Sequence, residues 1–131
     1  MANERILIIG AGGQIGLELI PALENIHGPG SVIPTDLHLL AHPQAKILNA
    51  LDQAGIRALV EAEQVTQIYL LAALLSATGE KNPSFAWELN MNSLLYVLEI
   101  AKEKKLKVFW PSSIAVFGPN TPRVKTPQYC V

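Results

Sequence analysis

Three glycines near the N-terminus have the G-x-x-G-x-x-G spacing of a phosphate-binding turn: Gly10, Gly13 and Gly16. They follow the apolar run at residues 6–9, and a helical pattern begins at Gln14. Such glycines allow a tight turn, close approach of the backbone to a pyrophosphate, and close packing of the next helix. The free N–H groups of that helix would face the anion, which adds Gln14 and Ile15 to the candidate cofactor-binding residues. Glycines also serve turns and helix packing without a ligand, so the pattern alone is ambiguous.

Asp36 ends a second apolar run, residues 31–35, and lies 20 residues after Gly16. An acidic side chain at the end of the second strand can accept hydrogen bonds from both ribose hydroxyls of an adenosine, and it repels a 2′-phosphate. Residues 37–40 contain no arginine that could receive such a phosphate. The sequence therefore predicts NAD rather than NADP, although a loop aspartate or a helix N-cap would give the same local pattern.

The elements that would position these residues alternate between strand-like and helical patterns, which is typical of a parallel sheet covered by helices. We expect strands at residues 5–9, 31–35, 45–48, 67–71 and 107–111. We expect helices at residues 14–25, 53–63 and 82–105. The predicted fold class is α/β: a Rossmann-like, doubly wound parallel sheet of about five strands in the order 3-2-1-4-5, forming a single NAD-binding domain over residues 1–131.

The predicted helix at residues 82–105 has a clear start and a continuous apolar stripe. Asn82 is placed to cap it, and Pro83 occupies the first helical position, where a missing N–H costs nothing. Six residues form the stripe at helical spacing: Trp87, Met91, Leu94, Leu95, Leu98 and Ala101. Packing of this helix on its own sheet would account for most of the stripe. Beyond Gly118, three prolines predict an irregular chain.

Composition argues against several functional classes. The net charge is -1 and 16% of the residues are charged, so there is no basic excess to bind nucleic acid or an anionic membrane. The apolar runs are far shorter than the ~18 residues of a membrane span. Residues 1–5 show no signal-peptide pattern, and we expect a cytoplasmic protein. The single cysteine, Cys130, allows neither an internal disulfide nor a cysteine-based zinc site.

Several segments together resemble the N-terminal part of the extended short-chain dehydrogenase/reductase superfamily. They are GAGGQIG, VIPTD, IYLLAALLSATGEKNP, AWELNMNSLLYVLEIAKEKKLK and VFWPSSIAVFGP. Within the superfamily, the chain looks most like the short-chain type of NAD-dependent L-threonine 3-dehydrogenase, a relative of the UDP-galactose 4-epimerases. The resemblance implies NAD as cofactor and L-threonine as a small-molecule substrate that is oxidised at C3 to 2-amino-3-oxobutyrate.

The same resemblance implies further contacts with the cofactor. Asn49, followed by Ala50, stands where the superfamily commonly has an acidic residue against the adenine amino group. Its amide can still hydrogen-bond there, with a neutral acceptor. Three residues would line the cofactor at the end of the fourth strand: Leu71, Ala72 and Ala73.

Catalytic and substrate-binding residues are also implied by the resemblance. Asn90 matches an asparagine that braces the active site through backbone and water, and Ser113 matches the serine or threonine that hydrogen-bonds the reacting hydroxyl or carbonyl. Three loop residues resemble the part that meets the amino-acid substrate: Ser76, Thr78 and Gly79. Without the resemblance, a capped turn at the end of a strand would be the simpler explanation of Ser113.

The superfamily's chemistry also needs a tyrosine followed four residues later by a lysine. The lysine lowers the pKa of the phenol, so that the tyrosinate takes the substrate proton. None of the three tyrosines has a lysine at that spacing: Tyr69, Tyr96 and Tyr129. We therefore expect a chain truncated before the later strands and the substrate domain, and inactive at this length.

Truncation would leave the last predicted strand as an exposed edge, so we expect a homo-oligomer that associates across this edge or through the stripe of the long helix. Two other functions stay open. One is a non-catalytic nucleotide-binding module. The other is a fragment of a nucleotide-sugar epimerase or dehydratase.

Overall fold

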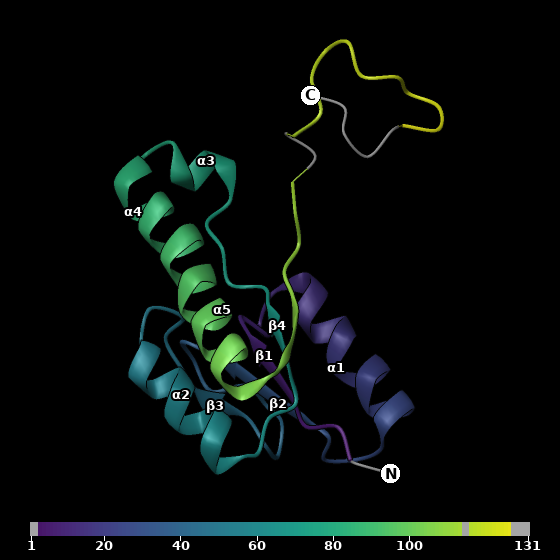
Figure 1. The fold of residues 1–131 in the computed structure, drawn as a ribbon, viewed down its shortest axis with the longest axis vertical. Helices are drawn as coiled ribbons and strands as arrows, with labels where there is room; N and C mark the ends of the chain where they lie inside the picture. The colour runs from purple at the N-terminus through teal and green to yellow at the C-terminus, as the bar shows by residue number, and fades with distance from the viewer. Residues whose placement is uncertain (1–2, 114–115, 127–131) are drawn as a thin grey trace.

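The computed structural model describes residues 3–113 and 116–126, and its centre is a five-stranded sheet (Figure 1). The strands are β1 (Ile6–Ile9), β2 (Val32–Asp36), β3 (Lys46–Ile47), β4 (Gln67–Leu70) and β5 (Lys107–Phe109). Neighbouring strands are parallel, and their order is β3-β2-β1-β4-β5. The predicted fold class and strand order are confirmed.

Helices cover both faces of the sheet (Figure 1). On one face lies α1 (Gln14–His27), whose buried side chains pack with Ile6 and Ile8 of β1. On the other lie α2 (Gln53–Ala62) and α5 (Ser93–Lys104), which pack with Leu7 and Ile9. Because β1 is buried on both faces, it is apolar at every position, which is the pattern of a central parallel strand.

Strand β3 is shorter than predicted, and Pro34 of the neighbouring strand gives the reason. The carbonyl of Thr35 accepts hydrogen bonds from the glycine turn after β1, so the polar groups of Thr35 face β1 and those of Pro34 face β3. Proline has no N–H to donate on that side. Pairing therefore starts only at Thr35 with Lys46, and the strand predicted at residues 45–48 is limited to Lys46–Ile47.

The helix predicted at residues 82–105 is continuous but not regular. It consists of α4 (Pro83–Trp87), a π-helical turn η1 (Glu88–Asn92), and α5. Asn82 caps it as predicted, because its side-chain oxygen accepts a hydrogen bond from Phe85 N at 3.2 Å. A short helix that the sequence did not predict, α3 (Ser76–Gly79), lies just before it.

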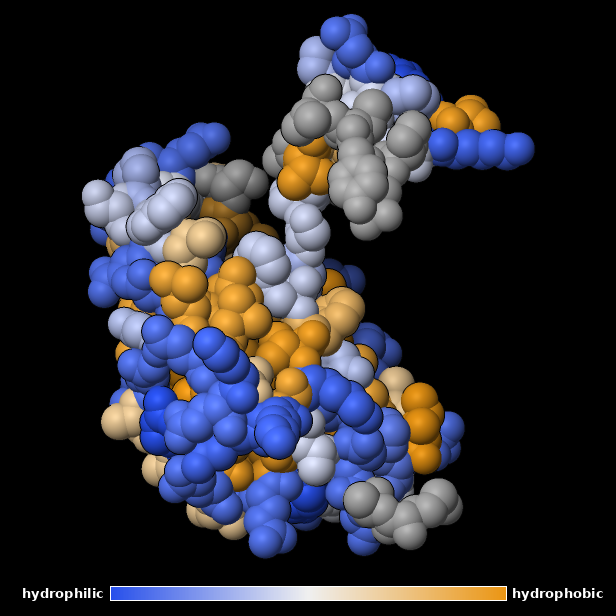
Figure 2. Space-filling model, viewed as in Figure 1, coloured by the Kyte–Doolittle hydropathy of each residue, from blue (hydrophilic) through white to orange (hydrophobic). Residues whose placement is uncertain are grey.

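The buried residues of this long helix all lie in α5, and α4 and η1 contain none. The buried side chains of α5 are Ser93, Val97, Ile100 and Ala101. The prediction that most of the stripe packs on the sheet is wrong for three residues, because Trp87 is 69% exposed, Leu95 51% and Leu98 46%. Figure 2 shows apolar side chains gathered over η1 and the adjoining part of α5.

The last part of the chain is irregular where the structure describes it, since residues 118–126 contain neither helix nor strand. Pro127, Tyr129 and Cys130 lie outside the described residues. None of the helices in the described part of the chain is long and apolar enough to cross a membrane.

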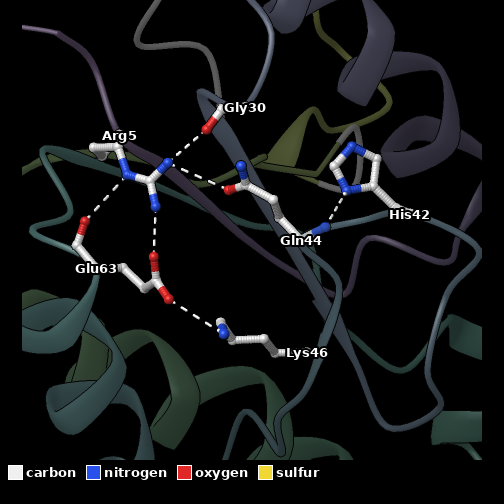
Figure 3. Close-up of polar contacts among 6 residues, drawn as sticks. All are labelled: Arg5, Gly30, His42, Gln44, Lys46 and Glu63. Carbon is white, nitrogen blue, oxygen red and sulfur yellow. Dashed lines mark hydrogen bonds and ion pairs between the residues drawn. The ribbon is translucent and has the colours of Figure 1, made fainter.

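Arg5 joins four segments at the edge of the sheet where the strands begin (Figure 3). Its guanidinium donates hydrogen bonds to Gly30 O, to Gln44 Oε1, and to both the backbone and the carboxylate of Glu63. Lys46 of β3 forms a second ion pair with Glu63 at 3.2 Å. One partly buried cluster thus fixes β1, the loop after α1, β3 and the end of α2 in place.

Acid is expected to remove part of the stability that this cluster provides. The hydrogen bond from Lys46, together with the interactions of Arg5, holds the pKa of Glu63 below its ordinary value of 4.5. Because the folded-state pKa is lowered, the ionised carboxylate stabilises the fold above pH 4.5, and the stabilisation is lost as the pH falls through the lowered value. We expect Glu63→Gln to lower the free energy of unfolding by about 1.5 kcal/mol at neutral pH.

Urea unfolding of wild type and variant, at pH 7 and at steps below 4.5, measures this effect. The difference between the two proteins should shrink as the pH falls. Glu18→Gln on the exposed side of α1 is the control, and it should match wild type throughout. A difference between wild type and Glu63→Gln that stays constant with pH would contradict the prediction.

Candidate functional site

A cavity of about 320 Å³ lies beyond the carboxyl ends of the central strands. Its size is at the lower end of the range for small-molecule sites, roughly 300–1,000 Å³. Predicted cofactor-binding residues from four separate segments line it together: Gly10, Gly13, Asp36, Asn49, Ala50, Leu71, Ala72 and Ala73. The remaining described lining residues are apolar and were not predicted: Ile9, Leu37, Leu48, Leu74 and Leu89. Apolar residues carry no sequence signal that separates a cavity wall from the core.

Glycine stands at each of the three positions of the turn for a different structural reason. Gly10 has a φ of +87°, and a Cβ there would lie 2.5 Å from Ala72 N. A Cβ on Gly16 would lie 2.3 Å from Ala11 O, so this glycine lets α1 pack on the turn. Gly13 differs, because the nearest atom to its Cβ position is 4.0 Å away. Packing within the protein therefore explains Gly10 and Gly16, whereas Gly13 borders open space in the cavity.

The N-terminus of α1 is suited to bind an anion. Gly13 is its N-cap, no side chain caps it, and its first turn contains no acidic residue. The first N–H groups of a helix lack partners within the helix and carry its positive dipole end. The side chains of Gln14 and Ile15 are exposed and do not line the cavity, so these residues could contribute only their backbone N–H groups.

Asp36 stands at the end of β2 and holds the glycine turn. Its Oδ2 accepts a hydrogen bond from Gly12 N at 2.8 Å, and its Oδ1 accepts one from Leu37 N at 2.7 Å. Each carboxylate oxygen can accept a further hydrogen bond from the cavity side. Gly12 was not predicted as a site residue. A Cβ there would lie 2.9 Å from Asp36 Oδ2, so the glycine allows this contact.

Asn90 lines a second cavity, of about 480 Å³. Its side chain accepts a hydrogen bond from Leu74 N at 2.9 Å and donates one to Leu74 O at 3.3 Å. Leu74 lines both cavities, and Gly79 and Trp87 line only the second. Asn90 therefore fixes the chain segment that separates the two cavities.

Of the other residues predicted for catalysis and substrate, Thr78 and Ser113 line neither cavity. Ser76 begins α3, and Thr78 in the same helix is exposed. Ser113 lies in the exposed segment after β5 and is not among the described residues that line either cavity. Within residues 3–113 and 116–126, no group of His, Cys, Asp or Glu side chains is placed to hold a metal ion.

Open parallel sheets of this strand order bind dinucleotides at the carboxyl edge, where successive connections run to opposite sides of the first strand. The cavity occupies that position, which defines the chain as a domain of the Rossmann dinucleotide-binding class. Residues 6–129 match the model of the NAD dependent epimerase/dehydratase family. The chain belongs to this family, whose cofactor is a nicotinamide dinucleotide.

Individual relatives are similar along nearly the whole chain. An uncharacterised epimerase/dehydratase of Staphylococcus saprophyticus is 45% identical over 134 residues, which cover 98% of this chain and 42% of that protein. The structure of a GalE-like L-threonine dehydrogenase from Cupriavidus necator, in its holo form, is 53% identical with a TM-score of 0.89 and covers 97% of this chain. An L-threonine dehydrogenase from Phytophthora infestans is 38% identical with a TM-score of 0.90 and covers 98%. The chain spans 43% and 42% of these two structures.

We expect alanine at Gly13 to weaken ligand binding and alanine at Gly16 to weaken the fold. At Gly13 the methyl group enters the open cavity, so the free energy of unfolding should change by less than about 1 kcal/mol while the affinity for ADP-ribose falls at least about tenfold. At Gly16 the methyl group meets Ala11 O, and the fold should lose about 2 kcal/mol or more. Urea unfolding and calorimetric titration separate the two effects. Unchanged ADP-ribose binding by a folded Gly13→Ala variant would show that the phosphates of the ligand do not bind at this turn.

Proposed function

We propose that the chain is the NAD-binding part of a dehydrogenase that oxidises L-threonine at C3 to 2-amino-3-oxobutyrate. The observation that supports it best is the open space at Gly13, beside the uncapped N-terminus of α1 and within the cavity that Asp36 also lines. The similarity to two L-threonine dehydrogenases supports the choice of substrate. When bound, NAD supplies the acceptor for the hydride that leaves the substrate carbon.

Each part of the site has a role in this proposal. Gly10, Gly13 and the backbone N–H groups of Gln14 and Ile15 bind the pyrophosphate, with Gly16 packing the helix beneath them. Asp36 binds the adenosine ribose, and its negative charge excludes the 2′-phosphate of NADP. The small residues that follow β4 allow the dinucleotide to lie close to the sheet: Ala72 and Ala73.

Substrate contacts come from the second cavity and from the chain after β5. Asn90 positions the Leu74 segment between the cofactor and the substrate. Ser113 hydrogen-bonds the reacting hydroxyl. Ser76, Thr78 and Gly79 contact the amino acid.

The chain alone is proposed to bind its cofactor without turning over substrate, because it contains no tyrosine followed four residues later by a lysine. A non-catalytic nucleotide-binding module is the main alternative, and part of a nucleotide-sugar epimerase or dehydratase is the second. Association into a homo-oligomer, a cytoplasmic location and the lack of nucleic-acid or membrane partners remain predictions.

Cofactor choice tests the role of Asp36. Wild type should bind NAD and ADP-ribose with comparable affinity and reject NADP, because the carboxylate repels the 2′-phosphate. Asp36→Asn should weaken NAD binding about tenfold, since one acceptor is lost, and should reduce the discrimination against NADP. Calorimetric titration of both proteins measures the three affinities, with Glu18→Gln as control. Equal binding of NAD and NADP by wild type would refute this role.

Turnover tests the proposed inactivity. No NADH should form when the chain is incubated with NAD and L-threonine, although ADP-ribose binding shows that the same sample is folded. Absorbance of NADH is the measurement, and conversion of UDP-galactose is followed beside it to test the epimerase alternative. Threonine-dependent formation of NADH would show that a different group acts as the base.

A further inference from the structure

Residues 48–50 line the first cavity beyond Asp36. The glycine turn follows β1, Asp36 ends β2, and Leu48 N donates a hydrogen bond to Asp36 O at 2.9 Å. Residues 48–50 therefore flank Asp36 on the side away from the glycine turn. If the pyrophosphate lies at the turn and the ribose at Asp36, as the proposed function states, the purine extends toward these residues.

Asn49 is one of only two polar side chains among the described residues that line the cavity, and the other is Asp36. The neighbours of Asn49 are Leu37, Leu48 and Ala50, which offer a purine edge no side-chain hydrogen bond. Any recognition of the base by side chains at this end therefore depends on Asn49.

The local turn fixes the orientation of the Asn49 side chain. Its Oδ1 accepts a hydrogen bond from Leu51 N at 2.9 Å, while its backbone carbonyl accepts one from Asp52 N at 2.9 Å. A backbone N–H can be accepted only by the oxygen of the amide, so the assignment of oxygen and nitrogen is determined by this contact. No other hydrogen bond of the Asn49 side chain occurs within the described part of the chain. The Nδ2 group is thus the donor that remains for a ligand.

We propose that Asn49 makes the purine subsite tolerant of a 6-keto base, so that the chain binds nicotinamide hypoxanthine dinucleotide about as well as NAD. A 6-aminopurine presents a donor at position 6 and an acceptor at N7, whereas a 6-ketopurine presents acceptors at both places. The Nδ2 donor of Asn49 complements a keto oxygen or a ring nitrogen, and Oδ1, which accepts only one hydrogen bond within the described residues, has a second lone pair for a 6-amino group. An aspartate at the same position would place an acceptor there and select the amino group.

Calorimetric titration with the two dinucleotides tests the inference. Wild type should bind them within about threefold of each other, because Nδ2 can donate to a keto oxygen while the second lone pair of Oδ1 can accept from an amino group. Asn49→Asp keeps an oxygen for Leu51 N and replaces the donor by an acceptor, so it should prefer NAD by about tenfold. Asn120→Asp, at an exposed position in the segment 116–126, makes the same change in charge and should leave the ratio unchanged.

The outcomes separate this inference from the function on which it rests. Binding of NAD with at least about tenfold weaker binding of the hypoxanthine analogue to wild type would overturn the inference alone. An unchanged ratio in a folded Asn49→Asp variant would also overturn it. If neither dinucleotide binds to wild type, the proposed function fails and the inference fails with it. The wild-type comparison is decisive even where the variant does not fold.

Discussion

The candidate site depends on the hydrogen bonds that the carbonyl of Thr35 accepts. This carbonyl accepts hydrogen bonds from both Gly10 N and Ala11 N at 2.9 Å, and thereby turns the chain sharply at the end of β1. The carbonyl of Ile9 does the same on the other side, where it accepts from the N–H groups of Leu71 and Ala72. These doubled contacts end the regular ladder on both sides of β1. The strands on its two sides are then followed by diverging segments, and the cavity lies between them.

The side of the sheet where the strands begin stabilises the fold, whereas the side where they end is suited to ligand binding. Where the strands begin, Arg5 and Glu63 satisfy one another and several backbone groups in a partly buried cluster. Where the strands end, the N-terminus of α1 has no side-chain cap and the donor of Asn49 has no partner among the described residues. These residues are exposed, so their polar groups can hydrogen-bond water until a ligand takes its place.

The parts of the structure that the sequence predicted are those with strong local signals. The apolar run of β1 and the glycine spacing predict strand, turn and helix, and Asp36 follows at the separation expected for a ribose contact. The π-helical turn had no such signal, because it accompanies a tertiary contact between Asn90 and the backbone of Leu74. The exposure of Leu95 and Leu98 was missed as well, because the buried face of α5 runs through Ser93, Val97 and Ile100 instead. The short β3 was predictable in principle from Pro34, but only once the strand order showed which side of Pro34 faces β3.

The sequence separations of the Arg5 contacts bear on how the fold forms and comes apart. Its partners Gly30, Gln44 and Glu63 lie 25, 39 and 58 residues away along the chain. Contacts with such separations require the closure of long loops, so we expect them to form late, once β1, β3 and the end of α2 have come together. Interactions that are absent from the transition state for folding change the unfolding rate rather than the folding rate. We therefore expect the Arg5 cluster mainly to slow unfolding and so to lengthen the lifetime of the folded domain.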